Sequence, residues 1–368
     1  MTATDYKIAQ STHPPGPVPI VWAGGTEGRT ERLPYLQAIR GVAAMAVVVH
    51  HVLKSRLVPG DAFGDLHLGQ AGVLLFFVLS GFIIAHTARD EPASNFARRR
   101  IIRVVPLYWL VTLVYAAILF RSDIARSGGI SFERLGDLGA SLLFVPHFHF
   151  RMTENVWPVL VQGWTLNFEM FFFFVFGLGL ALGHARVVAV GLLLWLVLLG
   201  AVTAPDDPRI LVWTSPLLLL FVAGIVLSWM HDIGWLTRSF AALPVGAILL
   251  VIGAVVSLPP GARDLVLGTG AILALGGTLA WQARRPGVGI PGLDTLGDAS
   301  YAIYLSHTVV LIPLGLVLPM LGLPLPITVI VAIIICAMAG WLLHVTVERP
   351  MTITLRQRFD RAANKGTS

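Results

Sequence analysis

The chain has 368 residues, of which 56% are hydrophobic and only 12% are charged, and its mean hydropathy is +0.78. Soluble proteins carry about 25% charged residues, so this composition excludes a soluble globular protein and predicts an all-α, polytopic bundle of transmembrane helices. The net charge of +6 would suit a nucleic-acid-binding protein, but the basic residues cluster at the ends of apolar segments, as topology signals do. We therefore expect the lipid bilayer, and no nucleic acid, as a partner.

The polarity of the chain divides it into three parts. Residues 1–33 are polar and proline-rich and lack the apolar core of a signal peptide; they are expected to form a flexible cytoplasmic tail. Residues 34–350 hold all the long apolar segments and are expected to form one integral membrane domain. Residues 351–368 are expected to form a basic cytoplasmic tail.

About ten apolar stretches are long enough, or nearly so, to cross a bilayer. Arginines gather in the loops that ten spans place on the side of the two ends, and this bias predicts cytoplasmic N- and C-termini. A further stretch, 138–148, is too short to span and is expected to be interfacial or re-entrant. The expected spans are 35–55, 70–88, 104–121, 164–183, 186–203, 211–230, 241–258, 264–282, 297–317 and 326–347.

The first expected span carries Arg40 and His51, eleven positions apart. Eleven steps of a helix leave only about 20° of rotation and advance about 16 Å, so the two side chains share one face without touching. Ionisable groups at membrane depth usually face a wet cavity or the protein interior. A histidine there can act as a general base, whereas the competing interpretation is that Arg40 snorkels to one surface and His51 lies at the other.

The second and third expected spans offer a hydroxyl and a group of arginines. Ser80 can hydrogen-bond across a helix interface. Arg100 and Arg103 are neighbours on a helical surface, and clustered guanidinium groups bind phosphate well. Arg99 precedes them, and Tyr108 follows Pro106, which is expected in the first turn of the third span. The competing interpretations are helix packing for Ser80 and contact with lipid phosphates for the arginines.

Two later segments add candidate cavity residues. Glu169 lies about one turn into an aromatic-rich span, where an isolated carboxylate should be paired, protonated or functional. Trp164 and Asn167 precede it. In the ninth expected span, Ser300, Tyr304 and His307 fall at i, i+4 and i+7 on one face. The segment Glu348-Arg349-Pro350 is interpreted as a simple helix stop.

Taken together, these segments resemble the acyltransferase 3 family of integral membrane O-acyltransferases, and within it the ExoZ-type exopolysaccharide acetyltransferases. The similarity rests on an ordered set of motifs rather than on any one of them. Many relatives have two acidic residues where this chain has Glu169 followed by Met170. The matching segments are Arg40 with His51, Phe76 to Phe82, Arg100 to Tyr108, Gln162 to Phe172, Ser300 to His307, and Glu348 to Pro350.

This resemblance implies a bacterial inner-membrane enzyme that moves an acetyl group from cytoplasmic acetyl-CoA to a sugar hydroxyl. The acceptor would be a glycan or a lipid-linked glycan, and polysaccharide assembly proteins stay open as partners. His51 would be general base or acyl acceptor, with Arg40 and Glu169 assisting. The donor would be bound by Arg99, Arg100, Arg103 and Tyr108, and the other cavity residues would be Ser80, Trp164, Asn167, Tyr304 and His307.

Three alternatives remain at this point. Arg40, His51, Glu169 and His307 could form the proton relay of a transporter. The chain could be a scaffold for polysaccharide export, or it could acylate a small molecule such as a macrolide. A metal site is not expected, because no cluster of cysteine and histidine is present and Cys336 is the only cysteine.

Overall fold

The computed structural model describes residues 34–60, 63–285 and 289–365. The predicted tail at 1–33 lies outside the described residues. Within the described part, every regular element is helical, as the composition predicts. The α-helices are α1 (Pro34–Leu53), α2 (Leu68–Thr87), α3 (Ala93–Ser127), α4 (Phe132–Leu142), α5 (Trp164–Ala181), α6 (Ala185–Thr203), α7 (Pro208–Trp213), α8 (Leu218–Asp232), α9 (Ala242–Val255), α10 (Pro260–Arg284), α11 (Leu293–Val317), α12 (Leu325–Leu343) and α13 (Arg349–Lys365).

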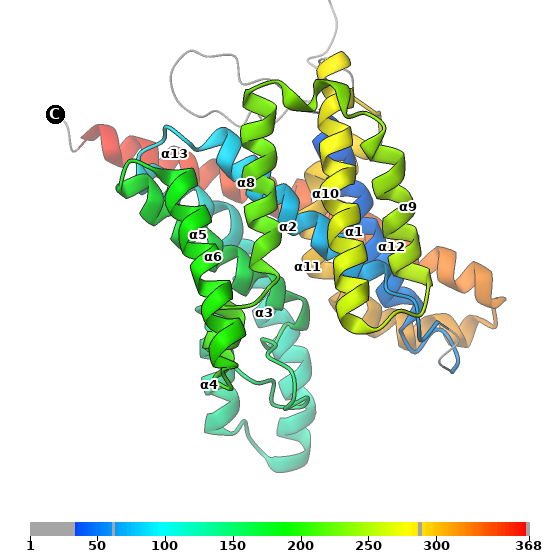
Figure 1. Ribbon diagram of the computed structural model, residues 1–368. Helices are drawn as coiled ribbons and strands as arrows, with labels where there is room; N and C mark the ends of the chain where they lie inside the picture. The colour runs from blue at the N-terminus through cyan, green and yellow to red at the C-terminus, as the bar shows by residue number, and fades with distance from the viewer. Residues whose placement is uncertain (1–33, 61–62, 286–288, 366–368) are drawn as a thin grey trace, which may run out of the picture.

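Each of the ten predicted spans coincides with helix, but they differ in length. Nine helical segments of the described chain are long and apolar enough to cross a membrane. The exception is α9, whose 14 residues extend about 21 Å against a hydrocarbon core of about 30 Å. It lies beside α10 as the second arm of a helical hairpin (Figure 1). The chain therefore reverses direction at α9 even though this helix is short.

Two expected boundaries were wrong. The arginine-rich segment after residue 92 is not a loop, because α3 begins at Ala93, so Pro106 lies inside the helix rather than in its first turn. The segment Glu348-Arg349-Pro350 does not stop the last span. A π-helical turn, His344–Glu348, leads directly into α13. Pro350 is the second residue of α13, directly after this π-helical turn.

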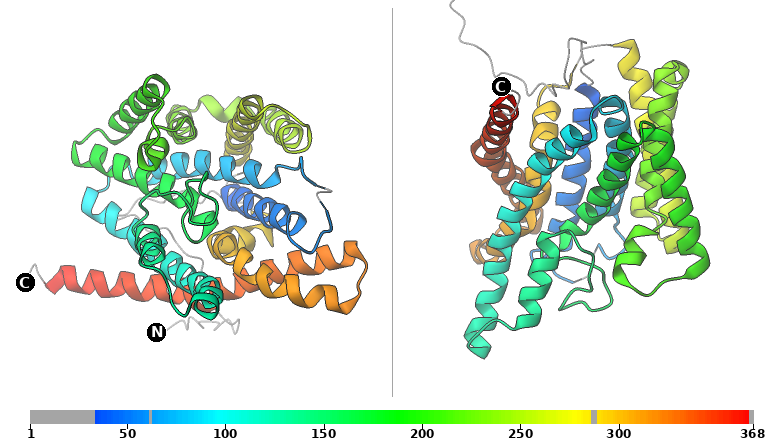
Figure 2. Two further views of the ribbon diagram at one scale, coloured as in Figure 1. Left: turned by 90° about the horizontal axis from the view of Figure 1, so that it is seen from below. Right: turned by 90° about the vertical axis from the view of Figure 1, so that its left-hand side faces the viewer.

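The described chain begins and ends at the same end of the bundle. Helix α1 starts, α2 ends and α3 starts at the upper end in Figure 1, and α13 extends outward there. Figure 2 shows the same arrangement from two other sides, with α3 and α4 projecting at the lower end. Helix α4 has eleven residues, so the first part of the 138–148 segment is helical but does not span.

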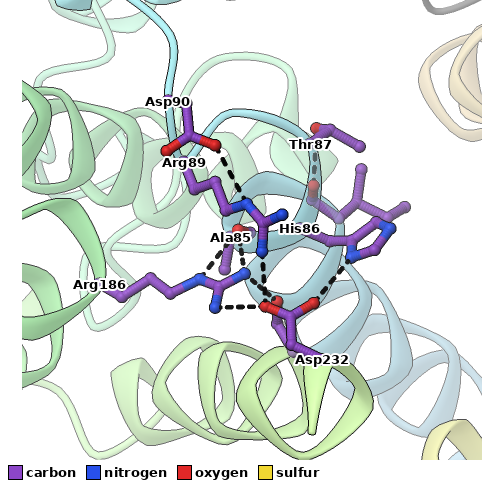
Figure 3. Close-up of polar contacts among 9 residues, drawn as sticks. Ala85, His86, Thr87, Arg89, Asp90, Arg186 and Asp232 are labelled. Carbon is purple, nitrogen blue, oxygen red and sulfur yellow. Dashed lines mark hydrogen bonds and ion pairs between the residues drawn. The ribbon is translucent and has the colours of Figure 1, made fainter. Parts of the chain in front are cut away.

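A cluster of charged side chains around Asp232, the Asp232 cluster, joins α2, α6 and α8 at the upper end (Figure 3). Arg186 donates to the carboxylate of Asp232 at 2.7 Å and to the carbonyl oxygen of Ala85 at 3.0 and 2.9 Å. Arg89 donates to the same carboxylate at 2.9 Å. Because these contacts satisfy a carbonyl at the end of α2 and tie three helices together, the cluster stabilises this end of the bundle.

Replacing Asp232 should destabilise the fold. In Asp232→Asn the side chain of Arg186, only 11% exposed, loses its anionic partner, which costs about 1–3 kcal/mol. Thermal unfolding of the purified protein in detergent should show a lower Tm. The matched control is Asp90→Asn, since Asp90 is 87% exposed in its pair with Arg89 and such pairs contribute about 0–1 kcal/mol. Equal Tm values for the two variants would contradict this assignment.

Candidate active site

Helices α1 and α11 approach each other so closely that only glycine fits at the contact. A Cβ atom added to Gly297 would lie 2.1 Å from the carbonyl oxygen of Gln37, and one added to Gly41 would lie 3.0 Å from that of Leu293. Small residues at a crossing let two membrane helices pack backbone to backbone. This contact fixes the position of every side chain that the two helices direct toward each other.

The same two helices bring His51 and His307 together. Ten residues separate Gly41 from His51, and ten separate Gly297 from His307. Equal offsets, about 15 Å of rise each, show that α1 and α11 run parallel with matched registers. The imidazole rings lie 4.9 Å apart between centroids, at an interplanar angle of 56°. The sequence identified both residues as candidates but did not predict that they form a pair.

The hydrogen bonds of the two rings define their tautomers. Nδ1 of His51 lies 2.9 Å from the carbonyl oxygen of Val47, and Nδ1 of His307 lies 3.2 Å from that of Ile303. A carbonyl oxygen only accepts, so both Nδ1 atoms carry hydrogen and donate it. Each neutral ring therefore presents an unprotonated Nε2 with a free lone pair. This is the form in which an imidazole can take a proton.

A neutral hydrogen-bond network lies beside the histidine pair. The hydroxyl of Tyr304 lies 2.9 Å from the hydroxyl of Thr165 and 2.9 Å from the carbonyl oxygen of Gln162. The amide of Gln162 in turn donates to the carbonyl oxygen of Leu305 at 3.0 Å and to the hydroxyl of Thr308. Tyr304 is thus held between α5 and α11, with its ring 6.2 Å from that of His307.

Glu169 does not fill the role that we expected for it. Its carboxylate accepts a hydrogen bond from Ser80 at 2.8 Å, and its electrostatic neighbours are Arg100, Arg40 and Arg103. The Nδ1 atom of His51, which a catalytic carboxylate would orient, is already bonded to Val47 within α1. Glu169 and Ser80 therefore link α5 to α2 and belong to the arginine end of the polar interior.

Arg40 faces a small basic cavity at the upper end of the bundle. The cavity has a volume of about 40 Å³, room for about three water molecules. Its walls hold four guanidinium groups and the carboxylate of Asp298, and one of the four, that of Arg103, is paired with Glu348, so the net charge is positive. Thr352 Oγ1 and Arg356 Nε are buried there without a hydrogen-bond partner. This donor set suits an anion. The lining residues are Arg40, Arg103, Asp298, Arg349, Thr352, Ile353 and Arg356.

The predicted donor residues on α3 have separate environments. Arg103 is paired with Glu348, whose other oxygen lies 2.8 Å from Nδ1 of His344. Arg99 is paired with Glu91. Arg100 lies over the rings of Phe96 and Phe173, 5.3 and 5.8 Å from their centroids. Of these three arginines, only Arg103 lines the basic cavity.

Tyr108 is part of the packing rather than of the cavity wall. It is fully buried, and its hydroxyl donates to the carbonyl oxygen of Ser141 at 3.1 Å. Its ring stacks on Phe144 at 4.7 Å and occupies the space in which a Cβ of residue 163 would lie. Gly163 is therefore required for the close approach of α3 to the start of α5.

The remaining predicted cavity residues fall into two groups. Trp164 packs edge to face on Phe77 and Phe168, at 6.2 and 5.8 Å. Asn167 and Ser300 are almost completely buried, yet Oδ1 of Asn167 and Oγ of Ser300 have no hydrogen-bond partner. A buried polar atom without a partner is costly, so these two suit an interior that receives water or substrate.

The far wall of the basic cavity was not predicted from the sequence. Glu348 and Arg349 were interpreted as part of a helix stop, Arg356 falls in the predicted tail, and Asp298 was not selected. Arg349 and Arg356 are seven positions apart, which is the spacing of one helical face and was the available signal. Among the described residues, no group of three or more histidine, cysteine and carboxylate side chains is arranged to hold a metal ion.

Comparisons with known proteins identify the class. The family model of the acyltransferase 3 domain matches residues 33–346, so the chain belongs to this family. The exopolysaccharide production protein ExoZ of Rhizobium meliloti (strain 1021) is 37% identical over 298 residues, covering 77% of this chain and 90% of that protein. Acyltransferase MdmB of Streptomyces mycarofaciens is 27% identical over 379 residues, covering 90% and 94%. No solved structure matches.

The protein is thus a multi-pass membrane O-acyltransferase. Family membership favours an enzyme over the transporter and the scaffold that the sequence left open. The polar interior described above, with the histidine pair and the basic cavity, is the place where an acyl donor and a hydroxyl acceptor could meet.

A methyl group at the α1–α11 contact should disrupt the site. In Gly297→Ala the new Cβ would lie 2.1 Å from the Gln37 carbonyl oxygen, a backbone atom that cannot move aside, so the helices must separate. We expect a lower Tm and at least a 10-fold loss of acyl transfer, since misplacement by about 1 Å can cost 100-fold. The control is Gly315→Ala. Gly315 lies on the same helix, but a Cβ added there would meet no atom within 4 Å, so this variant should retain activity. Full activity in Gly297→Ala would contradict the proposed contact.

Proposed function

We propose that the protein transfers an acetyl group from cytoplasmic acetyl-CoA to a hydroxyl of a surface polysaccharide or exopolysaccharide sugar, in the bacterial inner membrane. The observation that carries this proposal is the contact of His51 Nδ1 with the carbonyl oxygen of Val47 at 2.9 Å, because a ring that donates there leaves Nε2 free to accept a proton. The similarity to an exopolysaccharide production protein supports the choice of acceptor class. The acceptor is a glycan or lipid-linked glycan, and polysaccharide assembly proteins are its expected neighbours.

His51 acts as the general base in this reaction. The acceptor hydroxyl loses its proton to Nε2 of His51 while its oxygen bonds to the thioester carbonyl carbon. The carbon–sulfur bond then breaks, and the proton passes to the leaving thiolate to give free CoA. General-base assistance of this kind contributes about 10²–10⁴-fold to the rate. Transfer by way of an acyl-histidine uses the same nitrogen as a nucleophile.

The basic cavity receives the phosphate groups of the donor. Its four arginines supply more positive charge than Asp298 neutralises, and guanidinium groups bind phosphate through paired hydrogen bonds. This shifts the proposed donor contacts from the Arg99–Arg100 part of α3 to Arg40, Arg103 and the start of α13. Arg40 and His51 then serve the same substrate from positions about 16 Å apart along α1.

Loss of the His51 imidazole should abolish turnover. His51→Ala should lower kcat by at least 100-fold, because the general base is removed, while the KM for acetyl-CoA changes little. The assay is release of free CoA thiol by purified protein in liposomes supplied with acetyl-CoA and a glycan acceptor. Mass spectrometry of the glycan checks that acetyl groups have been added. Wild-type turnover in His51→Ala would refute the base assignment.

Substitution of two arginines of α13 tests whether the basic cavity binds the donor. Arg356 lines the cavity, whereas Arg358 is exposed and does not. Arg356→Ala should raise the KM for acetyl-CoA by about 10-fold or more, the usual cost of losing a charged hydrogen bond, with Arg358→Ala as the unchanged control. If both variants bind acetyl-CoA as well as wild type does, the phosphates bind elsewhere.

A further inference from the structure

We propose that His307 is a second functional imidazole of the site and that it stabilises His51 in its protonated state. This inference rests on the proposed function, since it assigns a partner to the base of that reaction. After His51 has taken the proton of the acceptor hydroxyl, its new Nε2–H still faces the substrate, and His307 would share this hydrogen through the lone pair of its own Nε2. His307 is thereby a positioning residue, and it exchanges no atom with the substrates.

The structure gives His307 a nitrogen without a hydrogen-bond partner, on a ring that lies against that of His51. The residue is fully buried, and its Nε2 atom has no hydrogen-bond partner. Its Nδ1 atom is occupied by the carbonyl oxygen of Ile303, so Nε2 is the atom with a free lone pair. The ring lies against His51 with 4.9 Å between centroids. The proposal places the two Nε2 atoms on the facing edges of these rings, where they share one hydrogen once His51 is protonated.

The environment of the pair holds His307 in position. A Cβ added to Gly340 of α12 would lie 2.5 Å from Cα of Ile303, so α11 is packed tightly on its far side as well. On the other side, Tyr304 is tied by hydrogen bonds to Thr165 and Gln162. An imidazole enclosed in this way is preorganised as an acceptor and requires no rearrangement when charge appears on His51.

His307 would stabilise the positive charge on His51, which the rest of the site does not do. A catalytic histidine is commonly supported by a carboxylate on Nδ1, which stabilises the imidazolium as it forms. In this protein the Nδ1 of His51 meets a neutral carbonyl oxygen instead, and Glu169 is bonded to Ser80. The lone pair of His307 supplies a hydrogen-bond acceptor for the new positive charge. When the proton leaves His51 for the thiolate of CoA, His51 returns to its neutral tautomer, and His307 has kept its own throughout.

The kinetic test compares two replacements of His307 that differ in whether the side chain can accept a hydrogen bond. His307→Phe keeps a ring of similar shape without an acceptor, and His307→Gln keeps an acceptor oxygen near the position of Nε2. We expect His307→Phe to lower kcat for acetyl transfer by about 10- to 100-fold, the cost of a lost hydrogen bond to a charged group, with the KM for acetyl-CoA within 2-fold. His307→Gln should recover much of this loss. The exposed His184→Gln serves as the unchanged control.

Equal kcat values for His307→Phe and His307→Gln, or a change in KM alone, would overturn the proposal and leave His307 as a packing residue. A second measurement does not require turnover. In protein labelled with ¹⁵N-histidine and acidified until the pair binds a proton, NMR should detect a scalar coupling between the two Nε2 atoms across a shared hydrogen. The coupling should vanish in His307→Gln.

The two measurements separate failure of this proposal from failure of the proposed function. If the wild-type protein transfers acetyl groups but shows no Nε2–Nε2 coupling, the role of His307 is refuted and the function stands. If the coupling is present but acetyl-CoA is not consumed with any glycan acceptor, the pair exists and the proposed donor or acceptor is wrong.

Discussion

The contact between α1 and α11 is the constraint on which the rest of the site depends. Gly41 and Gly297 remove the side chains that would hold the two helices apart, and the parallel registers then carry this closeness ten residues further, to His51 and His307. In a bilayer, helices gain little from burying apolar surface, so close van der Waals packing at small residues is a main source of association. The geometry of the histidine pair therefore depends on a close helix contact about 15 Å away.

The polar interior is organised into levels along this helix pair. The basic cavity with Arg40 and Arg103 lies at the upper end, the Glu169–Ser80 contact links α5 to α2, and the histidine pair with Tyr304 lies toward the lower end. Each level joins a different set of helices. A donor that extends from the cavity toward the histidines would contact α1 along its length, which explains why one helix carries both Arg40 and His51.

The arginine-rich start of α3 contributes to the stability of the fold. Arg98 contacts Asp360 of α13 at 3.3 Å, and Arg103 pairs with Glu348 in the π-helical turn. These ion pairs hold the C-terminal helix against the bundle, and this helix brings Arg349 and Arg356 into the cavity wall. Since removing one partner of a buried pair leaves an uncompensated charge, the cavity and the attachment of α13 are expected to be lost together.

The sequence by itself determined the class of fold, the positions of ten apolar helical segments and a set of candidate site residues, because long apolar stretches and the charges within them adopt few stable structures in a bilayer. Helical periodicity also placed Arg40 and His51 on one face of α1. Only the tertiary structure decided which residues meet. It paired His51 with His307 rather than with Glu169, placed Tyr108 in the packing, and brought α13 to the cavity. These outcomes follow from the registers and crossings of helices far apart in the chain, and periodicity within one helix carries no information about them.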